Sequence, residues 1–263
     1  MNINNQNNTP INLFNSESHS MKKITIAFSI FIFSQTLYSQ TWFDIGLKGG
    51  YGADFLINKN FYNDRYFSPK LSFGYILGGK IGINFTEMHA VTIDVTTSSF
   101  DQSFNYSHLN TDSSRTMCTR SFGFNSLNFL LMYRKTANVS YFEIGPQYSM
   151  ITKTRGSDNF TQTKNVDISE NLVESYYSAV IGFGTFLAGT DNFRVVLGFR
   201  FSYVLNDIIS STGQQINFPS ITKYDSYKPS NPFSAMLVAE LNFDLGYFTK
   251  SKCSKKKTAF LLF

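Results

Sequence analysis

A two-residue alternation of side chains runs through most of this chain and is clearest between Lys70 and Phe85. The odd positions there carry mostly large apolar groups, and the even positions carry mostly small or charged ones. Successive side chains of a β-strand point to opposite faces, so such a strand has one apolar and one polar face. The odd positions are Leu71, Phe73, Tyr75, Leu77, Gly79, Ile81, Ile83 and Phe85.

The same alternation returns often enough to predict eight strands. In several of them large aromatic residues share one face, whereas glycine and charged residues share the other. A barrel in lipid has this arrangement, with an apolar outside and a polar interior. The prediction is an all-β, closed, antiparallel, eight-stranded transmembrane up-and-down barrel. Its strands lie near residues 42–55, 69–85, 89–101, 118–135, 139–152, 173–188, 193–206 and 232–248.

Short and long connections alternate along the chain. The tight turns are Thr86–Met88, Thr136–Asn138 and Gly189–Asn192, and the long polar loops are 56–68, 102–117, 153–172 and 207–231. Outer-membrane barrels have short periplasmic turns and long external loops, so both chain ends are expected in the periplasm. A ten-stranded barrel is the alternative, if loop 102–117 or loop 207–231 contains another hairpin.

The fourth predicted strand breaks the alternation. Phe122 and Phe124 are out of phase with the outward residues from Leu127 to Tyr133. A β-bulge adds one residue to a strand and would restore the phase. We therefore predict a bulge around Asn125.

The chain begins with segments that are not expected in the barrel. Met21-Lys22-Lys23 precedes an apolar run over 24–33, and small or polar residues follow up to Gln40. This pattern is typical of a secretory signal peptide, and the run is too short for a spanning helix. The expected organisation is a polar extension or misassigned start over 1–20, a signal peptide over 21–40, the barrel over 41–248 and a basic periplasmic tail over 249–263.

Composition excludes several other classes of protein. A mean hydropathy of −0.15, with 17% aromatic and 16% charged residues, does not fit a bundle of transmembrane helices. The formal net charge of +5 derives largely from the tail lysines, which leaves the barrel nearly neutral. No basic patch carries interleaved stacking aromatics, so a nucleic-acid partner is not expected.

Charges on the inward face are the first candidate site. An eight-stranded barrel is only wide enough for its own side chains, so charges of both signs are expected to pair and plug the lumen. The alternative is an ion path, which would make the protein a small passive channel. The predicted lumen charges are Asp44, Lys48, Asp54, Lys80, Asp94, Glu143, Arg194, Arg200, Glu240 and Asp244.

Catalytic and metal-binding groups are scarce. Only His108, near Asp112, Ser113 and Ser114, suggests the alternative of a lipid-modifying enzyme, and no spacing there matches a catalytic triad. Three histidines and two separated cysteines offer no metal-ligand cluster. We predict no enzymatic activity and no cofactor, with Cys118 and Cys253 as free thiols.

Aromatic residues at the strand ends suggest interfacial girdles. Tyr66, Phe67, Tyr148, Tyr176 and Tyr177 are expected at the outer rim. The loop 207–231 also offers a large semi-rigid surface, so Phe218, Tyr224 and Tyr227 are the residues predicted to bind a partner. Loops on a rigid scaffold commonly carry binding. The expected partners are outer-membrane lipid and a protein met through the loops or the periplasmic rim.

Two terminal motifs and a glycine-spaced strand carry a family resemblance. They are the opening Phe43–Tyr51 (FDIGLKGGY), the strand 70–85 and the closing Ala239–Phe248 (AELNFDLGYF). With them the chain resembles the PorT-like outer-membrane β-barrel domain family of Gram-negative bacteria. The resemblance implies an outer-membrane barrel with a structural or interaction role. Because some relatives are linked to protein secretion, it also suggests an accessory role there.

Overall fold

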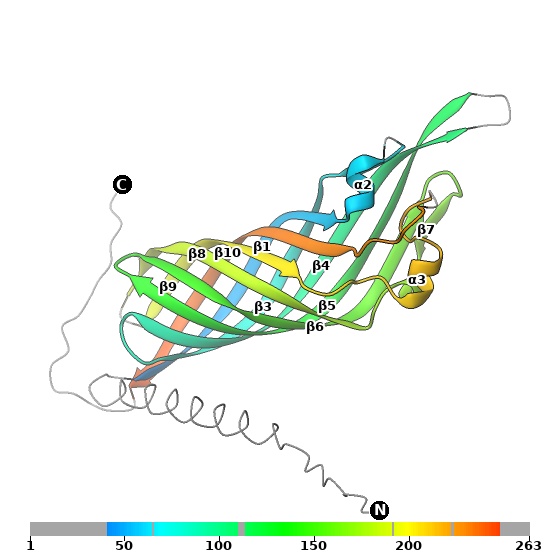
Figure 1. The fold of residues 1–263 in the computed structure, drawn as a ribbon. Helices are drawn as coiled ribbons and strands as arrows, with labels where there is room; N and C mark the ends of the chain where they lie inside the picture. The colour runs from blue at the N-terminus through cyan, green and yellow to red at the C-terminus, as the bar shows by residue number, and fades with distance from the viewer. Residues whose placement is uncertain (1–40, 65, 110–113, 191, 222–223, 248–263) are drawn as a thin grey trace, which may run out of the picture. The chain divides into compact units, whose positions relative to one another are not determined.

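Eight long strands form one closed barrel in the computed structural model (Figure 1). The structure describes residues 41–64, 66–109, 114–190, 192–221 and 224–247. The barrel strands are β1 (Trp42–Ile57), β3 (Ser72–Asn84), β4 (His89–Leu109), β5 (Arg115–Ala137), β6 (Ser140–Asp158), β8 (Ser175–Gly189), β9 (Phe193–Val204) and β10 (Asn231–Tyr247).

Every barrel strand pairs antiparallel with a strand on each side. The ring runs β1, β3, β4, β5, β6, β8, β9, β10 and back to β1. Closure satisfies the backbone hydrogen bonds of the strands and leaves the barrel wall without an open edge. The predicted fold class is confirmed, because the ring contains eight strands in up-and-down order.

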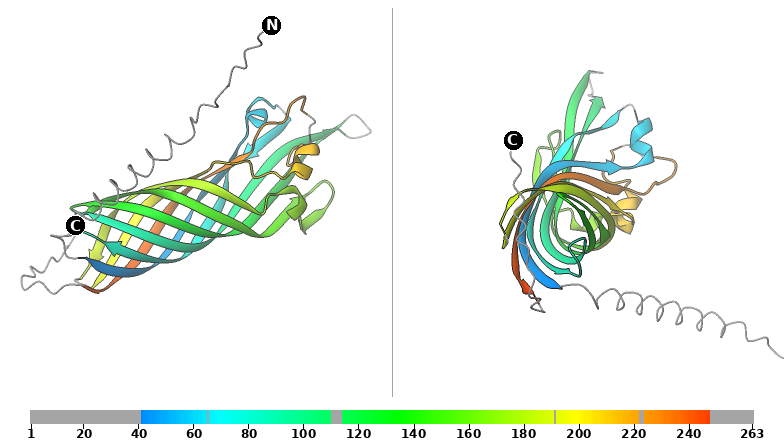
Figure 2. Two further views of the ribbon diagram at one scale, coloured as in Figure 1. Left: turned by 60° about the horizontal axis from the view of Figure 1, so that its bottom comes forward. Right: turned by 90° about the vertical axis from the view of Figure 1, so that its left-hand side faces the viewer.

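The shorter elements gather at the end of the barrel that carries the long connections (Figures 1 and 2). They are α2 (Lys59–Asn63), β2 (Phe67–Lys70), β7 (Thr163–Val166), the 3-10 turn η2 (Ser169–Asn171) and α3 (Ser211–Gln215). The short turns lie at the opposite end, where Trp42 pairs with Tyr247. No helix among the described residues is long and apolar enough to cross a membrane.

Three strands extend further into the predicted loops than the sequence pattern indicated. β4 continues to Leu109 and β5 begins at Arg115, so most of the predicted loop 102–117 is a longer hairpin. β6 likewise continues to Asp158. Alternation persists beyond the rim because inward side chains such as Phe104 and Tyr106 still pack there. The extra β-structure in loop 102–117 lengthens β4 and β5, the described part of loop 207–231 adds no strand to the ring, and the short strands β2 and β7 lie outside the ring. The ten-stranded alternative is therefore wrong.

The pairing is irregular at Asn125, but the predicted bulge in the fourth strand is wrong. The register of β5 against β6 shifts between Asn125 and Ser126, and the additional residue is Thr152 on β6. Phe122 and Phe124 therefore need no bulge in β5. They lie on the same inward face as Ser126 and are buried there.

The outward face of the barrel is apolar throughout its middle section. Leu77 keeps 60% of its surface exposed and Leu131 keeps 52%, whereas inward neighbours such as Lys80 and Met132 are buried. We call the outward set the apolar belt. It comprises Ile45, Leu47, Phe73, Leu77, Ile81, Ile93, Val95, Phe129, Leu131, Ile144, Ile181, Phe183, Phe199, Leu237, Leu241 and Phe243.

Candidate functional site: the filled lumen and its aromatic cap

Lys48 on β1 lies at the centre of a charged cluster inside the barrel. Its ammonium Nζ lies 2.8 Å from Glu240 Oε1 on β10 and 2.6 Å from Asp94 Oδ2 on β4. All three side chains are shielded from solvent. A buried charge is tolerated only when it is paired and hydrogen-bonded, so each of the three depends on the others.

Arg134 on β5 adds a cation that is not among the predicted lumen charges. Its guanidinium donates to Glu143 Oε2 at 2.6 Å and to Glu240 Oε1 at 2.7 Å, and it lies over the ring of Tyr141. Arg134 was overlooked although the alternation places it on the inward face together with Asn128. That phase is the signal that could have found it.

The remaining charges extend the cluster in two directions. Arg200 donates to Glu143 Oε1 at 2.5 Å and to Asp94 Oδ2 at 3.1 Å. Towards the short-turn end, Lys80 lies 3.6 Å from Glu240 and 3.7 Å from Asp44. Arg194 joins Asp44 to Asp244 in the same region, with contacts of 3.6 Å and 2.5 Å.

Nine of the ten predicted lumen charges therefore meet in one cluster, which we call the lumen charge network. With Arg134 it holds equal numbers of cations and carboxylates. Asp54, the tenth, lies apart, because its carboxylate accepts from Ser234 Oγ at 2.6 Å and from the Asp101 amide at 3.2 Å. The network members are Asp44, Lys48, Lys80, Asp94, Arg134, Glu143, Arg194, Arg200, Glu240 and Asp244.

Inward glycines make room for the network. A Cβ at Gly182 would lie 2.7 Å from Glu143 Oε1, and a Cβ at Gly82 would lie 2.2 Å from Asp44 Oδ1. Glycine in a strand commonly marks such a close approach. The glycine spacing seen in the sequence therefore serves the packing of charges inside the barrel.

A small cavity of about 50 Å³ lies beyond Arg200, towards the long-loop end. Phe100, Phe124 and Tyr176 line one part of it. Asn128 and Gln147 supply polar groups on other sides. One water needs roughly 10–15 Å³ of such volume, so this space suits a few water molecules.

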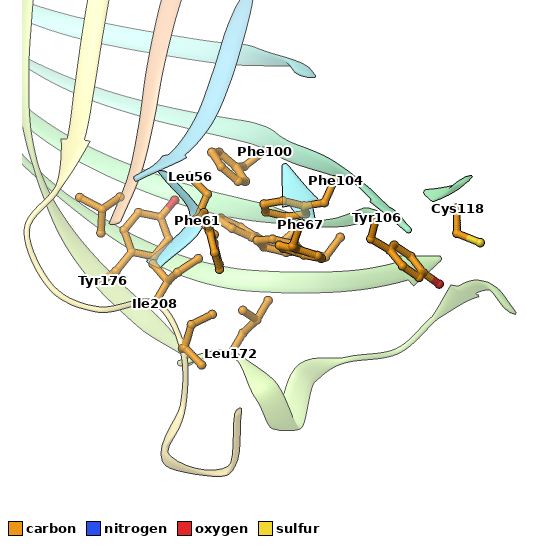
Figure 3. Close-up of a cluster of buried hydrophobic side chains, with 14 residues drawn as sticks. Leu56, Phe61, Phe67, Phe100, Phe104, Tyr106, Cys118, Leu172, Tyr176 and Ile208 are labelled. Carbon is orange, nitrogen blue, oxygen red and sulfur yellow. The ribbon is translucent and has the colours of Figure 1, made fainter. Parts of the chain in front are cut away.

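The long-loop end is closed by a cluster of buried apolar side chains, shown in Figure 3 and called here the aromatic cap. Its rings pack closely: Phe67 stacks on Phe104 with centroids 4.5 Å apart, and Phe100 stacks on Phe124 at 5.1 Å. The cap comprises Leu56, Phe61, Phe67, Phe100, Phe104, Tyr106, Cys118, Phe122, Phe124, Leu172, Tyr176, Val204, Ile208 and Ile209.

The cap corrects part of the predicted outer girdle. Phe67 is fully buried and Tyr176 is 5% exposed, so both belong to the barrel interior. Tyr148 and Tyr177 do form an outward pair, with ring centroids 5.2 Å apart, and Tyr177 is exposed. Phe67 was misassigned because β2 places this side chain opposite Tyr106 on the inward face.

The residues predicted to bind a partner lie against this cap. Phe218 meets the ring of Phe122 at 5.3 Å. The Tyr224 hydroxyl donates to Asp64 Oδ2 at 2.7 Å, and the Tyr227 hydroxyl donates to Asp207 Oδ2 at 2.6 Å. Burial, helped by the bond to Asp64, raises the pKa of Tyr224 to about 12. These side chains fasten the loop over the barrel.

Polar groups mark both edges of the apolar belt. At the long-loop edge Arg155 donates to Asp101 at 2.5 Å and to Asn125 Oδ1 at 2.8 Å. At the other edge His89 pairs with Lys135 across β4 and β5. The eleven residues from Asn125 to Lys135, with a rise of about 3.4 Å from each residue to the next and a tilt of about 40°, span roughly 26 Å. That height matches the ~25 Å apolar band of membrane barrels.

The groups weighed for catalysis or metal binding lie apart. The His108 ring lies 3.8 Å from the ring of Phe160, and Asp112 and Ser113 lie outside the described residues. Cys118 is a buried free thiol, and Cys253 lies outside the described part of the chain. Among the described residues no three histidine, cysteine or acidic side chains are grouped to hold a metal.

These features define a closed β-barrel with a charge-filled lumen and an aromatic cap. No protein-family model and no curated protein matches the sequence. Among solved structures, neisserial surface protein A aligns with 76% of this chain and 96% of its own at 10% identity and a TM-score of 0.37. The Ail protein of Yersinia pestis in complex with a heparin analogue aligns with 77% and 99% at 16% identity and a TM-score of 0.36.

OprG of Pseudomonas aeruginosa aligns with 78% of this chain and 97% of its own at 12% identity, with a TM-score of 0.37. At such scores and identities these likenesses carry no information on activity. The barrel assignment rests on the strand pairing itself.

Proposed function

We propose that the protein is an integral β-barrel of a Gram-negative outer membrane, with both chain ends at the periplasmic face. The apolar belt carries this proposal. Large side chains that stay exposed over a height of roughly 26 Å are stable in lipid and costly in water. The polar interior and the short turns at the same end of the barrel as Trp42 and Tyr247 support the same placement.

Within that membrane we propose a structural or interaction role, with no catalysis and no open pore. The lumen charge network lies across the interior of the barrel, and the aromatic cap closes its long-loop end. An ion entering from either end would have to displace paired charges or packed rings. The passive-channel alternative therefore requires a large rearrangement.

The surface available to a partner lies on the long connections. Phe218, Tyr224 and Tyr227 fix loop 207–231 to the cap, whereas Ile216 and Ile221 in the same loop are exposed. The extension of β4 and β5 exposes Leu109 and Met117 as well. Exposed apolar side chains on a rigid support favour protein contact.

An accessory role in protein secretion is the more specific version of this proposal. It is supported by the resemblance of the motifs at 43–51 and 239–248 to PorT-like barrels. Cross-linking in native membranes followed by purification in mild detergent tests it. Recovery of a reproducible secretion component, lost on Ile216→Ser/Ile221→Ser or on shortening of the β4–β5 extension, supports the role. A free monomer in every preparation contradicts it.

Two measurements test the broader proposal. A folded membrane barrel should sediment with outer membranes and migrate differently on gels before and after boiling. In planar bilayers the wild-type protein should give no stable conductance steps. Recovery as an unaltered species in the soluble fraction would contradict the membrane assignment, and steady porin-like conductance would contradict the filled lumen.

A further inference from the structure

His89, Tyr133 and Lys135 lie on neighbouring positions of the outer surface at the short-turn edge of the apolar belt. His89 on β4 is the cross-strand partner of Lys135 on β5. The imidazole Nδ1 of His89 lies 2.6 Å from the hydroxyl of Tyr133, and the two rings stack at 5.9 Å. Tyr133 and Lys135 are both exposed and lie two residues apart on the same face of β5.

The backbone around this group is fixed by the adjacent turn. The His89 amide donates to Thr86 Oγ1 at 3.0 Å, and its carbonyl accepts from the Phe85 amide at 2.9 Å. On the neighbouring strand the Thr136 amide donates to the Met88 carbonyl at 2.7 Å. The three side chains are therefore presented from a rigid hairpin junction, which lowers the entropic cost of binding a ligand.

The positive charge at this place is not neutralised by the barrel. Among the described residues no carboxylate lies within 4.0 Å of the Lys135 ammonium or the His89 ring, whereas Lys48 and Arg134 in the lumen each contact two acids. An ammonium group and an imidazole N–H donor suit the oxygens of a phosphate group.

The surface next to these donors is apolar. Lys135 pairs with Phe142 and Tyr133 pairs with Ile144 across β5 and β6, and both partners are exposed members of the outer surface. If a ligand were bound here through its phosphate, the rest of the ligand would contact the apolar belt. This combination fits a lipid with a phosphate headgroup better than it fits free phosphate.

We propose that Lys135 and His89, the latter positioned by Tyr133, bind the headgroup phosphate of a phosphoglycerolipid in the leaflet at the short-turn end of the barrel. This inference rests on the proposed membrane location. Lys135 and His89 donate to the phosphate oxygens, and the Tyr133 hydroxyl holds the imidazole against the strand. The acyl chains lie against Phe142 and Ile144.

Native mass spectrometry of the mature full-length protein in maltoside micelles, titrated with phosphatidylglycerol, tests the site. Lys135→Gln should raise the dissociation constant of the most tightly bound phosphatidylglycerol about fivefold, because one lysine near an anionic headgroup contributes ~1 kcal/mol. His89→Asn should also raise this dissociation constant. Lys153→Gln is the matched control, since Lys153 is an exposed lysine at the opposite edge of the belt, across from Asn125. Lys153→Gln should leave the dissociation constant of the most tightly bound lipid unchanged.

Two further ligands distinguish a lipid headgroup from a free phosphate compound as the ligand of this site. Glycerol 3-phosphate at the same concentration should not displace the lipid, and diacylglycerol should not occupy its site. Equal losses from Lys135→Gln and Lys153→Gln would show general electrostatic attraction and overturn the proposal. Displacement by glycerol 3-phosphate would overturn the lipid as ligand.

Different results would contradict the proposed membrane location. A protein outside the membrane would show no heat-dependent gel shift and would retain no lipid in any variant, including the wild type. A normal gel shift together with lipid binding that ignores Lys135 and His89 would overturn the headgroup site alone.

Discussion

Lys48 and Glu240 face each other across the seam where the first and last strands close the barrel. They are register partners on β1 and β10, and their charged atoms lie 2.8 Å apart. An ion pair that is buried at the centre of the lumen charge network therefore joins the first and last strands. Closure of the barrel and neutralisation of its interior depend on the same contact.

Glu240→Gln should destabilise the barrel strongly. Glu240 contacts Lys48, Lys80 and Arg134, so its loss leaves three buried cations short of a partner. Breaking a buried pair in this way costs about 3–5 kcal/mol. The urea midpoint for loss of the fast-migrating folded band should fall. Lys164→Gln, an exposed change on β7, should leave the midpoint in place, and equal effects of the two changes would contradict the network.

Gly182→Ala tests the space that the network needs. The new Cβ would meet Glu143, which Arg134 and Arg200 hold in place, so the cost should be about 1–3 kcal/mol of unfolding free energy. Gly49→Ala is a matched change in another strand, where the nearest atom lies 3.7 Å away. Its unfolding midpoint should be unchanged or slightly higher. A neutral Gly182→Ala would contradict the tight packing around Glu143.

Phe122→Ala should loosen the aromatic cap. The ring is buried between Phe104 and Phe218, and removal of a buried phenylalanine costs about 3–5 kcal/mol. Protease digestion of the intact barrel should then cut loop 207–231 faster. Phe129→Ala on the outward face removes the same ring from the belt and should leave cleavage of the loop unchanged. Faster cleavage in both variants would assign the effect to general instability.

Alkaline pH should release the same loop through Tyr224. Burial and the bond to Asp64 raise the pKa of Tyr224 to about 12 from the ordinary value of 10.0. A raised tyrosine pKa gives stability that is complete below pH 10 and is lost as pH rises through about 12. Loop cleavage should therefore accelerate in that window in the wild type. Tyr224→Phe has no proton to lose, so its cleavage rate should be less dependent on pH there.

The alternation of side chains predicted the strands and their faces because only one register places charges inside and apolar groups outside. Phe67, Phe122 and Tyr176 were less predictable, since an inward face expected to be polar becomes apolar near the cap. The alternation indicates which residues share a face of a strand. It does not indicate whether the barrel interior is polar or apolar at a given level along the barrel axis. Arg134 could have been assigned to the lumen from its phase.

The loops were the least predictable part. The extension of β4 and β5 continues the alternation with mostly serine, asparagine and threonine outward, a composition that also suits loops. The inward orientation of Phe218 and Tyr224 depends on contacts with Phe122 and Asp64, which are far away in sequence. Local patterns contain no information on such contacts.

Spin labels placed one at a time along β5 from Asn125 to Lys135 test the central claim most directly. In bilayers, oxygen accessibility should alternate with a period of two. It should be high at outward positions such as Leu131 and low at inward positions such as Met132, where a water-soluble nickel complex should also be excluded. The outward values should peak near the middle of the belt and fall towards both edges. Access of the nickel complex to Leu131, or the absence of alternation, would contradict a lipid-embedded barrel with a filled lumen.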